Sequence, residues 1–210
     1  MNSPPLKVIL ADPHLSLQAL ANYLDKDSRF ELQAAVENGG NLFLNLARPD
    51  PPDVVVTDID MPDMDGIELC LRLDRDYPQL NKMIFTHNCE PYTIRQLLDT
   101  SILGLLSKKN SFEDFGCCVE AVGRGHLHIG SPYSEMQARF KKQPQLNKYQ
   151  LKVLELLSQG YTTSQIAALT YKSEATVKLV KKSLYKISGT RNEVALGIWA
   201  LDNGYVRVRR

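Results

Sequence analysis

Five short apolar segments alternate with helical patterns in the first part of this 210-residue chain. The segments lie at residues 6–11, 30–36, 53–58, 82–86 and 104–107. Strands that are apolar almost throughout are typical of a parallel sheet covered on both faces, and helical crossovers are the usual connection between parallel strands. The pattern therefore predicts an α/β domain over residues 1–125, with a doubly wound, five-stranded parallel sheet and five helices.

The remaining chain has a different periodicity. Residues 126–145 lose the alternation, and we predict a linker there, with a short extended piece near 126–129 and a helical turn near 134–140. Residues 146–210 are predicted to form an all-α domain of four helices. These helices are expected at residues 148–159, 165–169, 173–187 and 192–203. The short turn before the third helix is typical of a helix-turn-helix.

The distribution of charge also separates the predicted α/β domain from the predicted helical domain. Residues 1–125 contain 11 Lys and Arg against 19 Asp and Glu, a net −8, whereas residues 146–210 contain 11 against 4, a net +7. The +1 of the whole chain hides this asymmetry. An acidic and a basic domain are expected to have different partners, and a basic helix-turn-helix is suited to a polyanion such as DNA.

Several classes of protein are disfavoured by the composition. No apolar run approaches the ~20 residues of a membrane span, and the first residues do not have the pattern of a signal peptide. We therefore expect a cytoplasmic protein without a membrane partner. The four cysteines form neither a Cys-x-x-Cys pair nor a zinc-ligand spacing with histidine, so free thiols are expected.

Polar residues follow the ends of four predicted strands, at Asp12, Asp58, Thr86 and Lys108. In a parallel sheet these ends meet at one edge, where ligands bind. Carboxylates hold hard cations such as Mg²⁺, which neutralises charge on a transferring phosphoryl group. A lysine and a hydroxyl can bind the phosphoryl oxygens. The four residues therefore suit a site of phosphoryl transfer.

One segment carries a long and specific motif, Asp-x-x-Met-Pro-x-Met-Asp-Gly at residues 58–66. It resembles the phosphoacceptor segment of two-component response-regulator receivers, and Thr86 after Ile-Phe and Lys108 after Gly-Leu-Leu-Ser resemble later landmarks of that family. The resemblance covers residues 6–125 and implies a flavodoxin-like receiver fold that binds Mg²⁺. It also implies that a histidine kinase phosphorylates Asp58, and that Thr86 and Lys108 report and stabilise the phosphorylated state.

Two positions depart from that family's pattern. Pro13 stands where receivers carry a second acidic residue, so Mg²⁺ affinity is expected to fall. The Asp60 carboxylate, together with those of Asp12 and Asp58, is predicted to complete the metal site. Leu105 stands at the switch position, where an aromatic residue is usual, so coupling to the output surface is expected to be altered. These departures leave open a regulator that works without phosphorylation, its receiver serving as a dimerisation or protein-interaction module.

A third hypothesis is an enzyme. Asp58 and Asp60 have the Asp-x-Asp spacing of haloacid-dehalogenase-like phosphatases, which also use an aspartate nucleophile at a strand end. The Met-Pro-x-Met-Asp-Gly continuation is unlike that site. We therefore expect that the protein is not an enzyme.

The basic domain resembles a second family. The segments that carry the resemblance are Leu146-x-x-x-Gln150-x-x-Val153-Leu154, Gly160-Tyr-Thr-Thr163, Gln165-Ile-Ala167 and Ser173-x-x-Thr176-Val-Lys178. They look like the LuxR-type output domain of the NarL/FixJ class of response regulators, which makes the third helix the recognition helix. A homodimer is expected, because paired half-sites multiply the limited affinity of one small domain, with residues 194–201 as the dimer face.

The recognition helix is predicted to bury a stripe of apolar residues three or four positions apart, at Val177, Val180, Leu184 and Ile187. Contacts with DNA are predicted at Ser173, Thr176, Lys178, Lys181, Lys182 and Lys186. Together the two resemblances imply a DNA-binding transcriptional response regulator that a histidine kinase controls through Asp58.

Overall fold

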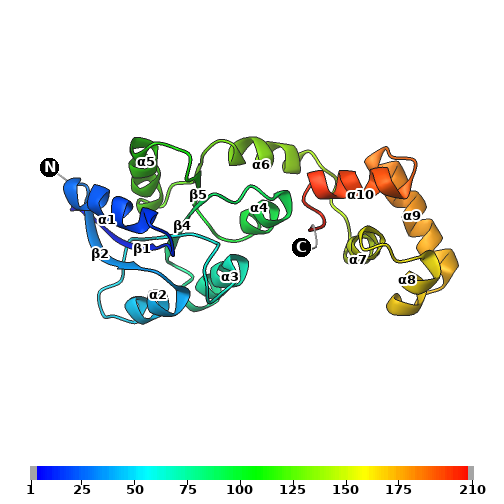
Figure 1. The fold of residues 1–210 in the computed structure, drawn as a ribbon, viewed down its shortest axis with the longest axis horizontal. Helices are drawn as coiled ribbons and strands as arrows, with labels where there is room; N and C mark the ends of the chain where they lie inside the picture. The colour runs from blue at the N-terminus through cyan, green and yellow to red at the C-terminus, as the bar shows by residue number, and fades with distance from the viewer. Residues whose placement is uncertain (1–3, 208–210) are drawn as a thin grey trace. The chain divides into compact units, whose positions relative to one another are not determined.

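The computed structural model describes residues 4–207 of the chain, and its contacts divide the chain into two compact units. The first unit comprises the residues up to Cys89 together with Gln96–Glu135, and the second comprises Glu90–Arg95 together with the residues from Met136 onward. Figure 1 labels the helices and strands of both units. Within the described residues, no helix is both long enough and apolar enough to cross a membrane.

The first unit is built on a parallel sheet with the strand order β2-β1-β3-β4-β5-β6. Its strands are β1 (Leu6–Ala11), β2 (Phe30–Val36), β3 (Val54–Thr57), β4 (Asn81–Thr86), β5 (Gly104–Ser107) and β6 (His128–Ile129). The helices between them are α1 (Ser16–Lys26), α2 (Gly39–Leu46), α3 (Gly66–Asp76), α4 (Pro91–Leu98) and α5 (Phe112–Gly123). The predicted five-stranded, doubly wound sheet is confirmed, and the short β6 extends its edge.

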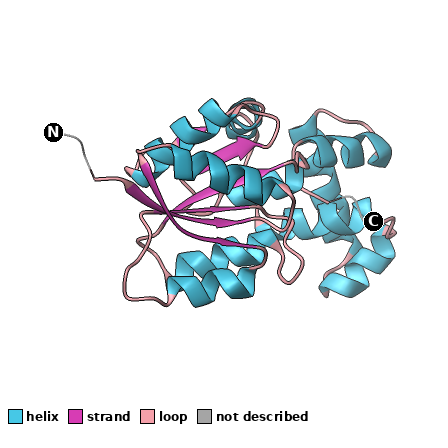
Figure 2. Cartoon of the chain, turned by 60° about the vertical axis from the view of Figure 1, so that its left-hand side comes forward, coloured by secondary structure: helices cyan, strands magenta, loops and turns pink. Residues whose placement is uncertain are grey.

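The side chains of the central strands alternate between two core layers. Leu10 of β1 packs in one cluster with Leu24 of α1 and Phe115 of α5, whereas the adjacent Ile9 packs in another with Leu42 of α2. Figure 2 shows helices on both sides of the sheet. Successive residues of a strand point to opposite faces, so a strand covered on both sides is apolar throughout. Polar chemistry is thereby confined to the strand ends.

Because all strand pairs are parallel, the strands end at one edge of the sheet. Ala11 of β1 lies opposite Thr57 of β3, and Thr86 of β4 lies opposite Ser107 of β5. The chain continues from these ends into the loops that carry the predicted acidic and basic residues. This edge is where ligands bind in open α/β sheets.

The segment predicted as a linker, residues 126–145, contains two regular elements. β6 pairs with the free edge of β5, and α6 (Tyr133–Lys141) is longer than the predicted turn. The difference has a physical reason, since the sheet edge supplies hydrogen-bond partners to β6 and the burial of Tyr133 anchors the start of α6. The part of this segment up to Glu135 accordingly groups with the first unit.

The second unit contains four helices that form a small domain. They are α7 (Lys148–Ser158), α8 (Thr163–Thr170), α9 (Glu174–Ser188) and α10 (Glu193–Asp202). Each follows a residue whose side-chain oxygen accepts a hydrogen bond from an amide of the first turn, namely Asn147, Thr162, Ser173 and Asn192. The four predicted helices are confirmed.

Of the predicted apolar stripe of α9, two residues are fully buried, whereas Val180 and Ile187 are only partly buried. Val177 and Leu184 are fully buried and pack in one cluster with Leu154 of α7 and Leu196 of α10. Val180 packs against the same cluster but is only partly buried. The opposite face of α9 is left to solvent, as expected for an amphipathic helix.

Candidate functional site

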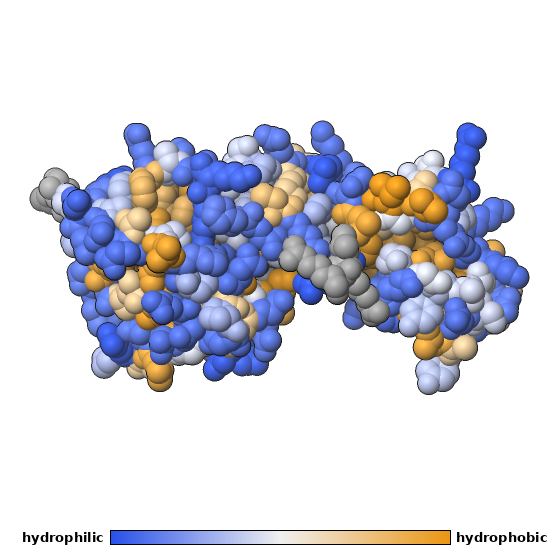
Figure 3. Space-filling model, viewed as in Figure 1, coloured by the Kyte–Doolittle hydropathy of each residue, from blue (hydrophilic) through white to orange (hydrophobic). Residues whose placement is uncertain are grey.

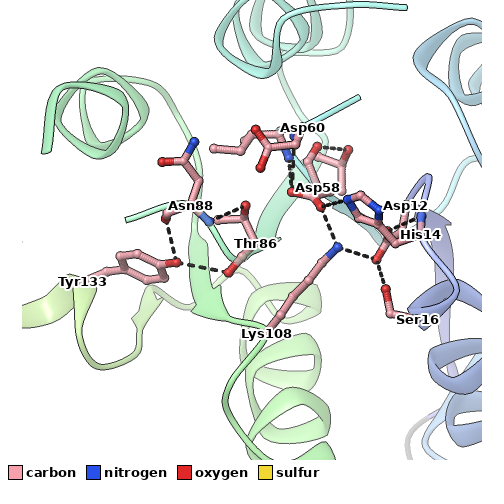
Figure 4. Close-up of polar contacts among 11 residues, drawn as sticks. Asp12, His14, Ser16, Asp58, Asp60, Thr86, Asn88, Lys108 and Tyr133 are labelled. Carbon is pink, nitrogen blue, oxygen red and sulfur yellow. Dashed lines mark hydrogen bonds and ion pairs between the residues drawn. The ribbon is translucent and has the colours of Figure 1, made fainter. Parts of the chain in front are cut away.

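Asp58 follows β3 and is almost fully buried, with 2% of its surface exposed. Its Oδ1 accepts hydrogen bonds from the backbone amides of Ile59 (2.6 Å) and Asp60 (3.3 Å). Its Oδ2 lies 2.5 Å from Nζ of Lys108 (Figure 4). Both oxygens are thus held by donors, and the orientation of the carboxylate is set before any ligand arrives.

Lys108 links Asp58 to a second carboxylate. Its Nζ lies 2.8 Å from Oδ2 of Asp12, and only 2% of its side chain is exposed. Asp12 also accepts hydrogen bonds from the amide of His14 (2.9 Å) and the hydroxyl of Ser16 (2.8 Å). Two carboxylates and one ammonium leave one net negative charge in a buried site. Buried charges need compensation, so the cluster is poised to accept a cation.

The pKa of Asp58 lies below its ordinary value. Burial alone acts in the opposite direction, because desolvation disfavours the charged carboxylate. The hydrogen bond and the charge of Lys108, together with the Thr86 hydroxyl and the Asp60 amide, outweigh burial and lower the pKa. Asp58 is therefore ionised at neutral pH, which is the form that can act as a nucleophile.

His14 enters the site although the sequence did not single it out. Its Nε2 lies 3.6 Å from Oδ2 of Asp58, and about half of its side chain is exposed. Asp12, His14 and Asp58 each offer one ligand atom, and these atoms all lie within 4.8 Å of one another. The sequence feature that could have identified His14 is its position, two residues after Asp12 in the same loop.

Asp60 contributes to the site in a different way from the prediction. It is exposed and donates its backbone amide to Asp58, and its backbone forms a bridge with Asp65. The group of potential metal ligands comprises Asp12, His14 and Asp58 and does not include the Asp60 carboxylate. The loop after β3 therefore places the backbone of Asp60, rather than its side chain, against the phosphoacceptor candidate.

The two predicted switch residues are both fully buried. The Oγ1 of Thr86 accepts a hydrogen bond from the amide of Asn88 (3.1 Å), while the same hydroxyl lowers the pKa of Asp58. Leu105 lies in β5 opposite Ile84 and offers an aliphatic side chain without a hydrogen-bonding group. Thr86 thus offers a hydroxyl near Asp58, whereas Leu105 supplies packing alone.

The exposed face of α9 carries most of the predicted DNA-binding residues. Lys178, Lys182 and Lys186 are exposed there. Ser173 and Thr176 form the start of the helix, where the Ser173 hydroxyl accepts from the Thr176 amide (3.1 Å). Lysines on one helix face near a helix N-terminus are suited to phosphate groups.

Lys181 is placed differently from its prediction. Its Nζ lies 2.5 Å from Oε1 of Glu193 and 3.3 Å from the hydroxyl of Thr163, and only 16% of its side chain is exposed. It therefore holds α9 against the neighbouring helices. Leu179, which the sequence did not single out, is 69% exposed among the lysines. Its position outside the buried stripe was the signal that could have identified it.

Comparisons with known proteins agree with this geometry. The family model described as the response regulator receiver domain matches residues 8–117. The response regulator protein VraR of Staphylococcus aureus (strain Mu3) is 26% identical over 87% of this chain and 88% of its own. The response regulator RcsB of Salmonella typhimurium has a similar structure, with a TM-score of 0.72 and 26% identity over 92% of this chain and 98% of that one.

A further similar structure contains two RcsB dimers bound to two parallel DNAs. It has a TM-score of 0.69 and 26% identity, and the match covers 93% of this chain and 97% of that one. The matched receiver domain spans more than half of the chain and contains the whole acidic cluster, while the structural matches extend through the helical domain. The chain belongs to the response regulator family, with its receiver domain at residues 8–117.

Proposed function

We propose that this protein is a DNA-binding transcriptional regulator whose receiver accepts a phosphoryl group on Asp58 from a histidine kinase. The observation that carries the proposal is the buried, ionised Asp58 carboxylate paired with Lys108 at the carboxyl edge of the sheet. A regulator of this kind is not an enzyme, in agreement with the response regulators that it resembles.

The residues of the site perform separate steps of the transfer. An oxygen of Asp58 attacks the phosphorus of a phosphohistidine, the new O–P bond forms as the N–P bond breaks, and the electron pair of that bond leaves with the imidazole. Asp58 has no proton to lose, because its lowered pKa keeps it ionised. The Lys108 ammonium and the Thr86 hydroxyl then bind oxygens of the transferred group.

The donor set of the site fits a divalent cation. Asp12 and Asp58 retain one net negative charge after pairing with Lys108, and their carboxylate oxygens are the ligands that Mg²⁺ prefers. Bound Mg²⁺ would neutralise charge on the phosphoryl group during transfer. Pro13 has no side-chain ligand to offer, so the affinity for Mg²⁺ is expected to be weaker than with a second acidic residue there.

The helical domain is proposed to bind DNA through α9. Lys178, Lys182 and Lys186 would neutralise phosphates, and RcsB, a relative of similar structure, is bound to DNA as dimers. A homodimer is proposed here too, because Val194 and Ile198 of α10 are 75% and 55% exposed. Figure 3 shows hydrophobic surface over α10 on the face in view.

The proposal is tested with beryllofluoride, a phosphoryl analogue, on the full chain. With Mg²⁺ present it should raise the dimer fraction in light scattering and the affinity for a duplex that the protein selects from a random-sequence pool. Asp58→Asn should abolish both responses. Asp60→Asn is the matched control and should retain them, because it keeps the backbone amide that Asp60 donates. A wild-type protein that changes neither mass nor affinity would contradict the proposal.

A second candidate is a regulator that works without phosphorylation. Pro13 in the metal-binding loop and the aliphatic Leu105 in β5 favour it. In that case Asp58→Asn would dimerise and bind the selected duplex as the wild type does, with or without beryllofluoride. The same experiment therefore separates the two candidates.

A further inference from the structure

Tyr133 is a buried aromatic residue whose role the proposed function leaves unexplained. It begins α6, follows the β6 strand, and is 0% exposed although its segment was predicted as a linker. Burying a tyrosine requires a partner for its hydroxyl, because an unpaired buried polar group is costly. The hydrogen-bond partners of this hydroxyl therefore indicate which part of the structure Tyr133 stabilises.

The hydroxyl of Tyr133 binds the loop that follows β4. It lies 3.1 Å from the carbonyl oxygen of Thr86 and 3.0 Å from that of Asn88, and its proton is shared between them. The Cys89 thiol lies 3.9 Å from the same hydroxyl. Burial raises the pKa of Tyr133, so the hydroxyl remains a donor over the whole physiological range.

The same loop lies beside the phosphoacceptor cluster (Figure 4). The Thr86 hydroxyl accepts a hydrogen bond from the amide of Asn88 at 3.1 Å, and its proximity lowers the pKa of Asp58. Figure 4 shows Tyr133, Asn88 and Thr86 each joined to the other two by polar contacts, with Asp58 nearby. The Thr86 side chain is therefore held by Asn88 and its carbonyl by Tyr133, and Tyr133 also binds the carbonyl of Asn88.

We infer that Tyr133 is a positioning residue that orients Thr86 toward Asp58 and couples the state of that site to the start of α6. The inference rests on the proposed function. A hydrogen bond tolerates only small changes in distance, so a shift of the loop when Asp58 is modified would break the contacts of the Tyr133 hydroxyl. Coupling of this kind is reciprocal, so loss of the hydroxyl would also weaken binding at Asp58.

Leu105 strengthens the argument because it cannot take this role. It is fully buried beside β4, but its side chain has no group that could bond to Thr86 or Asn88. Tyr133 contacts the same loop from the segment that follows β6. β6 pairs with β5, and the Gly130 amide just after it donates a hydrogen bond to the Leu105 carbonyl (2.9 Å), which places Tyr133 near the loop. The polar link is thus supplied by a residue far along the chain.

The test uses the full chain and Tyr133→Phe, which removes one oxygen and keeps the ring. Tyr77→Phe is the matched control, since Tyr77 lies in the first unit with its ring against Phe43. The first readout is hydrogen exchange of the Asn88 amide without any phosphoryl analogue. Tyr133→Phe should exchange this amide about five-fold faster, the equivalent of one lost neutral hydrogen bond. An unchanged rate would overturn the positioning role.

The second readout is the response to beryllofluoride with Mg²⁺. In the wild type and in Tyr77→Phe, binding should change the exchange of residues 133–141. Tyr133→Phe should bind the analogue about five-fold more weakly and lose that change. If Tyr133→Phe transmits the same change at the same affinity, the coupling is refuted. If the wild type itself fails to bind the analogue, the proposed phosphorylation and the coupling fail, while the Asn88 rate still decides whether Tyr133 positions Thr86.

Discussion

Replacing Lys108 by methionine removes the one ammonium that lies between Asp12 and Asp58, at 2.8 and 2.5 Å. The substitution keeps most of the side-chain volume, so packing changes little. It leaves two carboxylates with side-chain exposures of 5% and 1% facing each other without that cation. Removing one partner of a buried ion pair costs about 3–5 kcal/mol. We expect the free energy of unfolding to fall by about this amount at neutral pH.

The penalty depends on pH in a direction that follows from the pKa of Asp58. In the wild type this pKa is depressed, so its contribution to stability is present above the ordinary value of 3.8 and is lost as pH falls through the lower, folded pKa. Without Lys108, burial raises the pKa above 3.8 instead. The destabilisation of the variant is therefore complete above that raised pKa and shrinks as the folded variant takes up a proton.

Urea unfolding at about pH 7 and at about pH 4 measures both effects. Lys109→Met is the matched control, because Lys109 is the exposed neighbour and its loss should change the unfolding free energy by less than about 0.5 kcal/mol. Equal destabilisation by the two substitutions would refute the argument that the ion pair is buried. A penalty for Lys108→Met that is the same at both pH values would refute the assignment of the charge to Asp58.

Three further predictions concern helix α9 and the potential metal ligands beside Asp58. Lys182→Ala should reduce the slope of log affinity for DNA against log salt concentration by about one unit. Lys181→Ala should leave this slope unchanged, because the Lys181 ammonium is bound to Glu193. Equal slopes for the two variants in a salt titration would contradict this difference. Leu179→Ser should abolish any preference for thymine over deoxyuridine in the selected duplex, because the exposed leucine would be the apolar group that meets the thymine methyl. A preference that survives the substitution would argue against that contact. His14→Ala should weaken Ni²⁺ several-fold more than Mg²⁺, because imidazole nitrogen suits Ni²⁺; calorimetric titrations that show equal losses would exclude His14 as a ligand.

The fold of the first unit was predictable because its signal is local. Strands buried on both faces must be apolar along their length, and parallel strands must be joined by crossovers, so the alternation of segments is sufficient to predict the sheet. The same logic places Asp12, Asp58 and Lys108 at one edge. The extended piece predicted near residues 126–129 corresponds to β6, but its pairing with β5 was not predictable, because a two-residue segment has no periodicity of its own.

The roles of individual polar residues were less predictable than their positions. Asp60 was expected to offer its carboxylate and instead donates its amide to Asp58, because the turn after β3 decides which group faces the site. Lys181 and Lys182 are adjacent and chemically identical, yet Glu193 binds the first and leaves the second exposed. That difference depends on which helix packs beside α9.

The amino-acid sequence alone thus determined the layers of the receiver, the edge that carries the acidic cluster and the basic face of the recognition helix, because periodicity and strand direction are properties of short segments. Tertiary structure decided which side chains contact one another. It enclosed Lys108 between two carboxylates, added His14 to the same site, and brought Tyr133 from the segment after β6 onto the loop that holds Thr86. Such contacts join residues far apart in the chain, and burial selects them, because each polar group removed from water must find a partner.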